Sequence, residues 1–304
     1  MGIREEDLNF GVIPFSHSYG FSNLITPLLC RGVPLAASED PLPRAILNGL
    51  ARTGATVFAG MPVFYEKLAG LADGPALPGL RLCISAGAPL PGRVGEAFSA
   101  RFLRKVHTFY GSSECGGIGY DGDEERVFED GYVGRAMCGV RIEALGGEAE
   151  EGRIAVRSRA VGLGYYPEPE EETLGGGRFV PGDVVRFGPR GMALTGRATD
   201  VINVAGRKLN PIEVERALAQ CPGVREVVVF GVQSALRGEE PVACVCGSAT
   251  AEEVTRHARE RLSAWQVPKD VWVVSEMPVN ERGKISRREL GKRYGERQVG
   301  SAAI

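Results

Sequence analysis

Short apolar runs alternate with helical stretches in the first half of the chain, and this alternation constrains the fold most. The runs at 55–59, 80–85 and 106–110 have the length and composition of buried strands. Between them, the stretches at 63–71 and 92–102 have the apolar spacing of helices. Strands that alternate with helices pair in parallel, because each helix carries the chain back across the sheet. We therefore expect an α/β fold built on a parallel sheet.

The pattern changes twice further along the chain. After Gly131 the sequence holds short strand-like runs separated by glycine turns, which predicts a small antiparallel sheet or barrel. At Asn210 an Asn-Pro-Ile-Glu helix start introduces the helices and strands of a compact α+β unit of about 100 residues. The expected organisation is therefore an α/β part of a large domain at 1–130, a β-subdomain of that domain at 131–195, a hinge at 196–200 and a small mobile α+β domain at 201–304.

The composition is that of a globular protein, and the sequence argues against a membrane-spanning protein and against a secreted one. Apolar residues make up 43% of the chain and charged residues 24%, and no run approaches the roughly 20 apolar residues of a membrane-spanning helix. The first ten residues include Arg4, Glu5, Glu6 and Asp7, where a signal peptide would be apolar. We expect no membrane span and a cytoplasmic location. The seven cysteines are irregularly spaced, which indicates reduced thiols rather than a disulfide framework or a zinc site.

The net charge of -2 argues against bulk nucleic-acid binding. The carboxy-terminal part is nevertheless basic, with seven Lys and Arg against three Glu between Glu281 and Arg297. This excess suits an anionic ligand, and it equally suits a solvated helix face.

Two glycine-rich segments follow predicted strands, at Ser85–Leu90 and around Gly111. Turns in this position bind phosphates in α/β proteins, because their backbone N–H groups can face an anion. In the second segment, expected to be a turn, Tyr110 offers a stacking surface, Ser112 and Ser113 offer hydroxyls, and Glu114 offers an oxygen for Mg²⁺. Taken alone, each segment is equally typical of an ordinary solvated turn.

Four further charged residues are each compatible with an ordinary structural role. Asp183 in its Pro-Gly turn could bond its own backbone or accept from a ribose diol. Arg197 and Asp200 could form a simple surface ion pair. Lys284 could be solvated or could meet a phosphate. The Gly-Lys pair at this lysine is followed by Ile, which excludes a Walker-type phosphate loop there.

The order of these motifs is more specific than any one of them. Along the chain they are PFSHSYG at 14–20, SAGAPL at 85–90, YGSSE at 110–114, PGD at 181–183, GRATDVINVAGRKLNPIEVE at 196–215 and NERGKISR at 280–287. This ordered set resembles the adenylate-forming superfamily, which comprises acyl-CoA synthetases, peptide-synthetase adenylation domains and luciferases. The resemblance spans residues 10–290.

The resemblance implies a nucleotide site with Mg²⁺. Gly87, Ala88 and Pro89 would border adenine, and Tyr110 would pack on its ring. Gly111 and Ser112 would also belong to the nucleotide site. Ser113 would contact the phosphate of AMP, Asp183 would hold the ribose hydroxyls, and Arg197 would contact ribose or phosphate. Glu114 would be the Mg²⁺ ligand.

The resemblance also implies residues for catalysis and motion. Lys284 would be the catalytic lysine between the carboxylate substrate and the transferred phosphate, and Asp200 the hinge residue. Gly206 would line the thiol tunnel. His17 would lie at the wall of the acyl pocket, or it would be a locally hydrogen-bonded histidine at the edge of the core. The implied reaction uses ATP to turn a fatty or aryl acid into an acyl-adenylate and passes the acyl group to coenzyme A or to a carrier-protein pantetheine.

One departure from the family pattern qualifies this expectation. The family carries a Ser/Thr/Gly-rich phosphate loop upstream of the motif that here begins at Pro14, and the sequence holds no equivalent. We therefore expect an amino-terminally truncated chain that exposes an apolar face, or half of a split enzyme that needs a partner chain. The alternative is a non-catalytic module that binds AMP or an acyl-adenylate. Smaller departures are Pro181 in place of a frequent Thr and Asn203 in place of the usual Lys.

Overall fold

The structure is a computed structural model, and it describes residues 1–145, 151–234, 238–278 and 285–301. The chain divides into two compact units, Met1–Thr195 and Gly196–Ile304, which are described separately below. None of the helices in the described ranges combines the length and apolar character needed to cross a membrane.

The first unit is built on one sheet, which has 13 strands in the described part of the chain. One end of this sheet is parallel, as the sequence predicts. Its strands, in spatial order, are β2 (Leu35–Ala37), β1 (Asn9–Gly11), β3 (Val57–Gly60), β4 (Leu82–Ser85) and β5 (Val106–Ser112).

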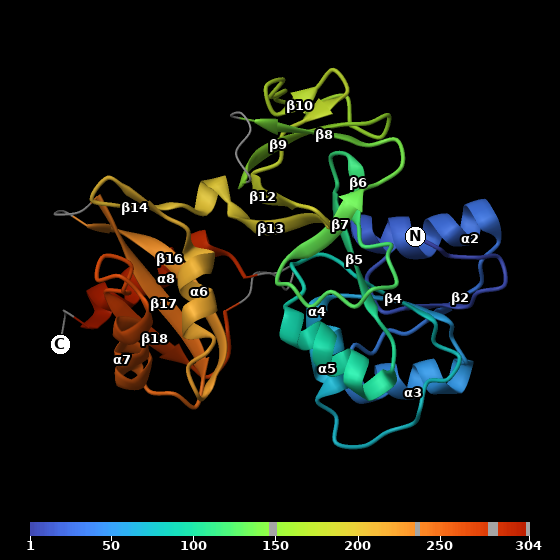
Figure 1. The fold of residues 1–304 in the computed structure, drawn as a ribbon, viewed down its shortest axis with the longest axis horizontal. Coiled ribbons are helices and arrows are strands. Elements are labelled where there is room, and N and C mark those ends of the chain that lie inside the picture. The colour runs from blue at the N-terminus through green and yellow to red at the C-terminus, as the bar shows by residue number, and fades with distance from the viewer. Residues whose placement is uncertain (146–150, 235–237, 279–284, 302–304) are drawn as a thin grey trace. The chain divides into compact units, whose positions relative to one another are not determined.

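Helices cover both faces of the parallel strands (Figure 1). One face carries α3 (Pro43–Thr53), α4 (Pro62–Ala69) and α5 (Gly92–Phe102). The bounds of α5 are those that the spacing of its apolar residues predicts. On the other face, α1 (Ser18–Gly20), a π-helical turn (Phe21–Ile25) and α2 (Thr26–Arg31) follow one another. Alternate residues of β3 enter different cores, because successive side chains of a strand point to opposite faces. Phe58 packs with Leu50, Tyr65 and Phe98, whereas Ala59 packs with Leu24.

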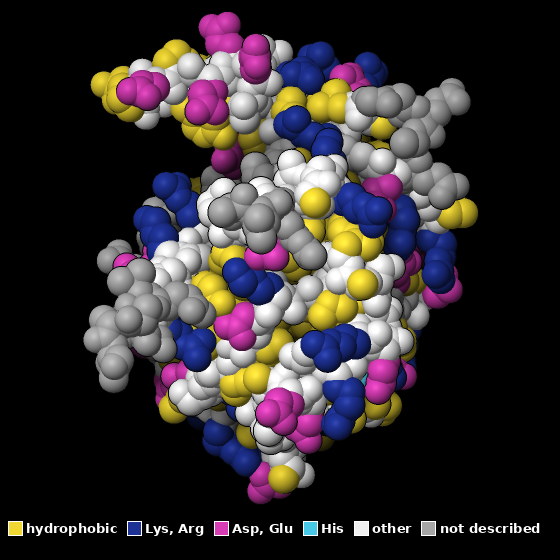
Figure 2. Space-filling model, turned by 90° about the vertical axis from the view of Figure 1, so that its left-hand side faces the viewer, with side chains coloured by type: hydrophobic (Ala, Val, Ile, Leu, Met, Phe, Trp, Pro, Cys, Tyr) yellow, Lys and Arg dark blue, Asp and Glu magenta, His cyan; other side chains and the backbone are white. Residues whose placement is uncertain are grey.

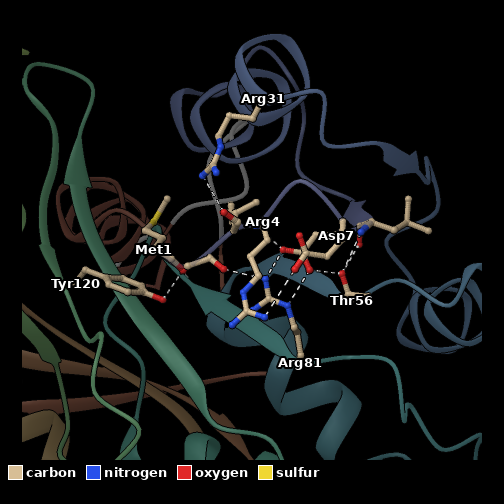
Figure 3. A network of polar contacts seen from close by, with 11 residues as sticks. Met1, Arg4, Asp7, Arg31, Thr56, Arg81 and Tyr120 are labelled. Carbon is tan, nitrogen blue, oxygen red and sulfur yellow. Dashed lines mark hydrogen bonds and ion pairs between the residues drawn. The ribbon is translucent and has the colours of Figure 1, made fainter.

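The amino-terminal segment exposes several large apolar side chains. Leu29 is 73% exposed, and Phe15, Phe21 and Leu42 are also exposed. Other parts of this segment are tied down by polar contacts around Asp7, which Figure 3 shows.

The sheet continues beyond β5 as antiparallel strands, which the sequence predicts from residue 132 on but as a small sheet of their own. They are β6 (Gly116–Tyr120), β7 (Tyr132–Ala136), β13 (Gly191–Arg197), β12 (Asp183–Gly188), β9 (Glu151–Arg157), β11 (Arg178–Phe179) and β10 (Leu174–Gly175), with β8 (Arg141–Leu145) also paired to β9. These strands enclose a core of their own, which includes Ile118, Ile154, Val185 and Met192.

The sequence prediction was wrong about where β5 ends. The strand was expected to stop at Tyr110, but it runs through Ser112, and the turn consists of residues 113–115. The physical reason is the neighbouring strand β6, which pairs with Ser112 through Gly116. Glycine is required at position 111, because a Cβ there would lie 2.9 Å from the Gly116 oxygen.

The second unit is a five-stranded sheet, within the described residues, with helices on both faces. Its strands are β14 (Ile202–Val204), β15 (Arg207–Leu209), β16 (Val224–Ser234), β17 (Gly238–Gly247) and β18 (Asp270–Val274). One face carries α6 (Pro211–Leu218) and α7 (Ala251–Arg261), and the other carries α8 (Arg287–Ser301). The predicted cap of α6 is present, since the Asn210 side chain accepts from the Ile212 N–H at 3.1 Å. Cys244 and Cys246 share one buried cluster, because alternate residues of a strand point to the same face.

Figure 2 shows basic and acidic side chains intermixed with apolar ones on the face that it presents. On that face the charges are not sorted into one basic patch.

Candidate functional site

The two glycine-rich segments lie at one edge of the parallel sheet. Ser85 ends β4 and pairs with Thr108 of β5, which runs parallel to it and continues to Ser112, so both strands point their carboxyl ends to this edge. Beyond Ser85, Gly87, Ala88 and Pro89 are exposed. Gly87 has a φ of +86°, a conformation that favours glycine. The sequence-predicted turn therefore presents its backbone at the edge where α/β proteins bind ligands.

Two buried tyrosines fix the end of β4. The hydroxyls of Tyr19 and Tyr65 both donate to the Ile84 carbonyl, at 2.8 and 2.9 Å. Burial raises the pKa of both phenols. They therefore act as neutral donors that hold the strand end below the exposed turn.

A hydrogen bond joins two motifs that lie far apart in the sequence. The Tyr110 hydroxyl donates to Oδ2 of Asp183 at 2.8 Å, across 73 positions. Tyr110 is buried on β5, and Asp183 is the half-buried first residue of β12. In the strand order, β13, β7 and β6 separate the two strands, so strand pairing does not create this contact. The hydrogen bond holds the Asp183 carboxylate at the hydroxyl of the tyrosine ring.

The carboxylate of Glu114 is held by two hydroxyls. Ser112 bonds to its Oε2, and the Tyr165 hydroxyl donates to its Oε1 at 3.2 Å. Burial, and after it the charge of Glu114, raise the pKa of Tyr165, so the phenol is a proton donor here. Burial also raises the pKa of the adjacent Cys115 to about 12, so its thiol is not activated as a nucleophile. Tyr165 was not predicted, because no local spacing relates it to a residue 51 positions earlier.

A further contact brings the first motif to the same turn. The Ser113 hydroxyl donates to the Ser18 hydroxyl at 3.0 Å. Beside Ser18, Nδ1 of His17 accepts from the Tyr19 N–H at 3.1 Å and caps α1. The local hydrogen bond expected of one interpretation of His17 is therefore present, and its alternative role at an acyl pocket stays a prediction.

The remaining predicted residues belong to the later part of the chain. Arg197 is the exposed last residue of β13, and Asp200 ends a short 3-10 helix. Asp200 accepts from Nη1 of Arg287 at 2.8 Å, and sequence reasoning had given Arg287 no role. Gly206 has a φ of +83° in the exposed hairpin between β14 and β15. The predicted catalytic residue Lys284 lies outside the described residues.

Glu114 is the residue that fits a magnesium ion. In the described ranges no three His, Cys, Asp or Glu side chains gather as a metal site. Mg²⁺ does not require such a group, because it commonly binds through one or two carboxylates together with substrate phosphates and water. Each Glu114 oxygen receives one hydroxyl and has two lone pairs, so acceptor capacity is left for a cation.

Comparison with known proteins agrees with the motif order. The family model described as AMP-binding enzyme matches residues 2–166, and the model of the AMP-binding enzyme C-terminal domain matches residues 213–284. Benzoate–CoA ligase of Thauera aromatica is 30% identical over 95% of this chain and 59% of its own length. Long-chain-fatty-acid–CoA ligase of Bacillus subtilis is 29% identical over 92% of this chain and 53% of its own length.

Solved structures give the same result. ATP-bound MatB from Rhodopseudomonas palustris has a TM-score of 0.86 at 28% identity and matches 96% of this chain and 61% of its own. A benzoate CoA ligase from Burkholderia xenovorans has a TM-score of 0.81 at 29% identity, and the match covers 95% of this chain and 62% of that one. The chain thus spans between half and two thirds of the length of these proteins. The predicted resemblance is confirmed, and the chain belongs to the AMP-binding enzyme family.

Proposed function

We propose that this chain carries the nucleotide site of an ATP-dependent acid–thiol ligase that makes acyl-CoA. The observation that carries the proposal is the 2.8 Å bond from Tyr110 to Asp183, because it unites an aromatic surface with an oriented carboxylate. Such a pair suits a nucleoside, with the ring against the base and the carboxylate accepting from the ribose diol. Gly87, Ala88 and Pro89 would complete the base-binding edge.

The turn that follows β5 would hold the phosphate end of the nucleotide. The Ser113 hydroxyl would donate to the phosphate, and Gly111 and Ser112 at the end of β5 would also contact the nucleotide. Glu114 would hold Mg²⁺, which supplies positive charge to the phosphates when bound. Arg197 would add a charged contact to ribose or phosphate.

The proposed chemistry has two balanced steps. A carboxylate oxygen of the acid attacks the α-phosphorus of ATP, and pyrophosphate leaves with the electron pair of the broken P–O bond. The sulfur of coenzyme A then attacks the acyl carbon of the mixed anhydride, loses its proton, and AMP leaves. Lys284 is proposed from the sequence alone as the cation that stabilises the charge developing in the first step.

The remaining roles are proposed on the family resemblance. The acid would be a fatty or aryl acid, in keeping with the names of the relatives. His17 would lie beside the acyl group, and Gly206 would line the path of the thiol of coenzyme A or of a carrier-protein pantetheine. Asp200 would be the hinge, with the domains divided at 1–130, 131–195, 196–200 and 201–304. A further segment or partner chain would complete the phosphate site.

The test is an assay of the chain with ATP, Mg²⁺, coenzyme A and a panel of benzoate, ferulate and palmitate, with pyrophosphate and AMP release measured. AMP affinity is measured by calorimetry in parallel, with Asp183→Asn as the site variant. Pyrophosphate release that depends on the acid supports the ligase. AMP binding that Asp183→Asn weakens, without pyrophosphate release, would identify a binding module or half-enzyme instead. No binding of AMP would overturn the proposed site.

A further inference from the structure

The two hydroxyls that hold Glu114 come from different parts of the chain. Ser112 is two positions away on β5, whereas Tyr165 belongs to the segment that follows β9. Tyr165 lies at the surface and is 36% exposed. Its hydroxyl is 3.2 Å from Oε1 of Glu114. The second contact to Glu114 is therefore made by a residue from a distant segment of the chain, outside the motif that contains Glu114.

The backbone fastens the Tyr165 segment to the Glu114 turn. The Gly162 N–H donates to the Glu114 carbonyl oxygen at 2.7 Å. Upstream, the N–H of Ala160 donates to the Ser158 hydroxyl at 3.2 Å, which shapes the start of the segment. A Cβ at Gly162 would lie 3.4 Å from the Glu114 oxygen, so the approach is close. Tyr165 is thereby brought to Glu114 by a fixed main-chain contact three residues away.

The partners of Glu114 differ in kind from those of the buried carboxylates of this unit. Asp121 is paired with Lys105 at 2.8 Å, and Asp7 is paired with Arg81 in the network of Figure 3. Those pairs neutralise the carboxylate. Within the described ranges, by contrast, no Lys or Arg pairs with Glu114, whose hydrogen-bond partners at the side chain are hydroxyls. Neutral donors orient a carboxylate while they leave its negative charge available to a cation.

We propose that Tyr165 is a positioning residue, which holds the Glu114 carboxylate in the orientation that takes the divalent cation of a nucleoside triphosphate. A glutamate side chain loses considerable rotamer freedom when it is fixed. A ligand that is oriented in advance binds its cation at lower entropic cost. This inference rests on the proposed function, because it requires that Glu114 meets the cation.

The experiment compares Tyr165→Phe with Tyr166→Phe. Tyr166 is the adjacent residue and is 96% exposed, so loss of its hydroxyl is a matched control. ATP affinity is measured on the full chain by calorimetry, once with Mg²⁺ and once with EDTA. We expect Tyr165→Phe to weaken binding of ATP with Mg²⁺ by about 2- to 12-fold, the range of one hydrogen bond. Affinity in EDTA and the thermal unfolding midpoint should stay at the wild-type values.

Glu114→Gln separates failure of this inference from failure of the proposed function. If Glu114→Gln abolishes the gain in affinity that Mg²⁺ gives, and Tyr165→Phe behaves like Tyr166→Phe, the positioning role is overturned and the metal role stands. If Glu114→Gln has no effect on that gain, the positioning role of Tyr165 and the metal role of Glu114 are both overturned. Equal weakening of ATP binding with Mg²⁺ and with EDTA in Tyr165→Phe would mark a general structural role and would also overturn the inference. Ser112→Ala removes the other hydroxyl and should reproduce the Mg²⁺-specific loss if Tyr165→Phe fails to fold.

Discussion

The guanidinium of Arg287 donates two hydrogen bonds to the carboxylate of Glu215, at 2.8 and 3.0 Å. The same two side chains bond to one residue of β16, since Glu215 accepts from the Val229 N–H at 2.7 Å and Arg287 donates to the Val229 carbonyl at 3.0 Å. β16 ends the strand order of its sheet in the described residues. The ion pair therefore satisfies backbone groups that a further strand would otherwise pair with.

Removing Glu215 should destabilise the second unit. We expect Glu215→Ala to lower the free energy of unfolding by about 2–3 kcal/mol, because it leaves the Val229 N–H without its acceptor and removes the carboxylate that accepts from Nη2 of Arg287. Glu213→Ala, on the exposed side of the same helix, should change it by less than about 1 kcal/mol. Urea unfolding measures both. Equal effects of the two variants would contradict the role of the ion pair.

The Asp7 network predicts a pH dependence of stability. Burial raises the pKa of Asp7, but hydrogen bonds from Arg81, the Arg4 N–H and Thr56 outweigh it and hold the pKa below its usual value of 3.8. A lowered pKa means that this stabilisation is present above pH 3.8 and is lost as the pH falls through the lowered value. In Figure 3 these residues surround the Asp7 carboxylate.

Asp7→Asn should therefore cost about 3 kcal/mol at pH 7, where wild-type Asp7 is ionised and buried. The difference between wild type and variant should shrink below about pH 4. Chemical unfolding between pH 3 and pH 7 measures this, with Glu5→Gln as the control for loss of one acidic charge nearby. A difference that is constant over this pH range would show that the ionised form of Asp7 is not the source of the stability.

The bond from Tyr110 to Asp183 predicts graded losses of AMP affinity. Tyr110→Phe keeps the ring and removes only the hydroxyl, so AMP binding should weaken by about 2- to 12-fold. Asp183→Asn should weaken it more, because it removes the charged acceptor for the ribose hydroxyls. Tyr132→Phe is the control, since it removes a hydroxyl that donates to the Arg190 carbonyl at 3.0 Å elsewhere in the unit. Calorimetry of AMP binding would contradict the site if Tyr132→Phe gave the larger loss.

Local signals predicted the elements, and tertiary contacts decided the rest. The helix at 92–102 was predicted with its observed bounds, because its apolar spacing is regular. The helix α8 was not predicted, because Leu290 and Tyr294 are its buried apolar contacts and the rest of the helix is strongly polar. The contact between Tyr165 and Glu114 depends on how two distant segments pack, which no local pattern encodes.

The proposed role of Lys284 predicts separate effects on the two half-reactions. In a form of the protein that releases pyrophosphate, Lys284→Ala should slow acyl-adenylate formation by on the order of 10²-fold or more, because it removes the cation at the developing charge. Attack of coenzyme A on a supplied acyl-adenylate should stay near the wild-type rate. Lys292→Ala, in the exposed part of α8, is the control. Equal loss of both steps would exclude the proposed role.

The contact of Asp200 with Arg287 refines the hinge prediction. Asp200→Pro fixes φ near −65° and also removes the carboxylate that accepts from Arg287 at 2.8 Å, so on its own it confounds backbone rigidity with loss of the ion pair. Asp200→Asn keeps the backbone free and removes only the charge. If rotation at residue 200 serves the second half-reaction, Asp200→Pro should slow thioester formation from a supplied adenylate, whereas Asp200→Asn should leave it close to wild type. Similar slowing by both variants would assign the effect to the ion pair, because the asparagine backbone turns as freely as that of aspartate.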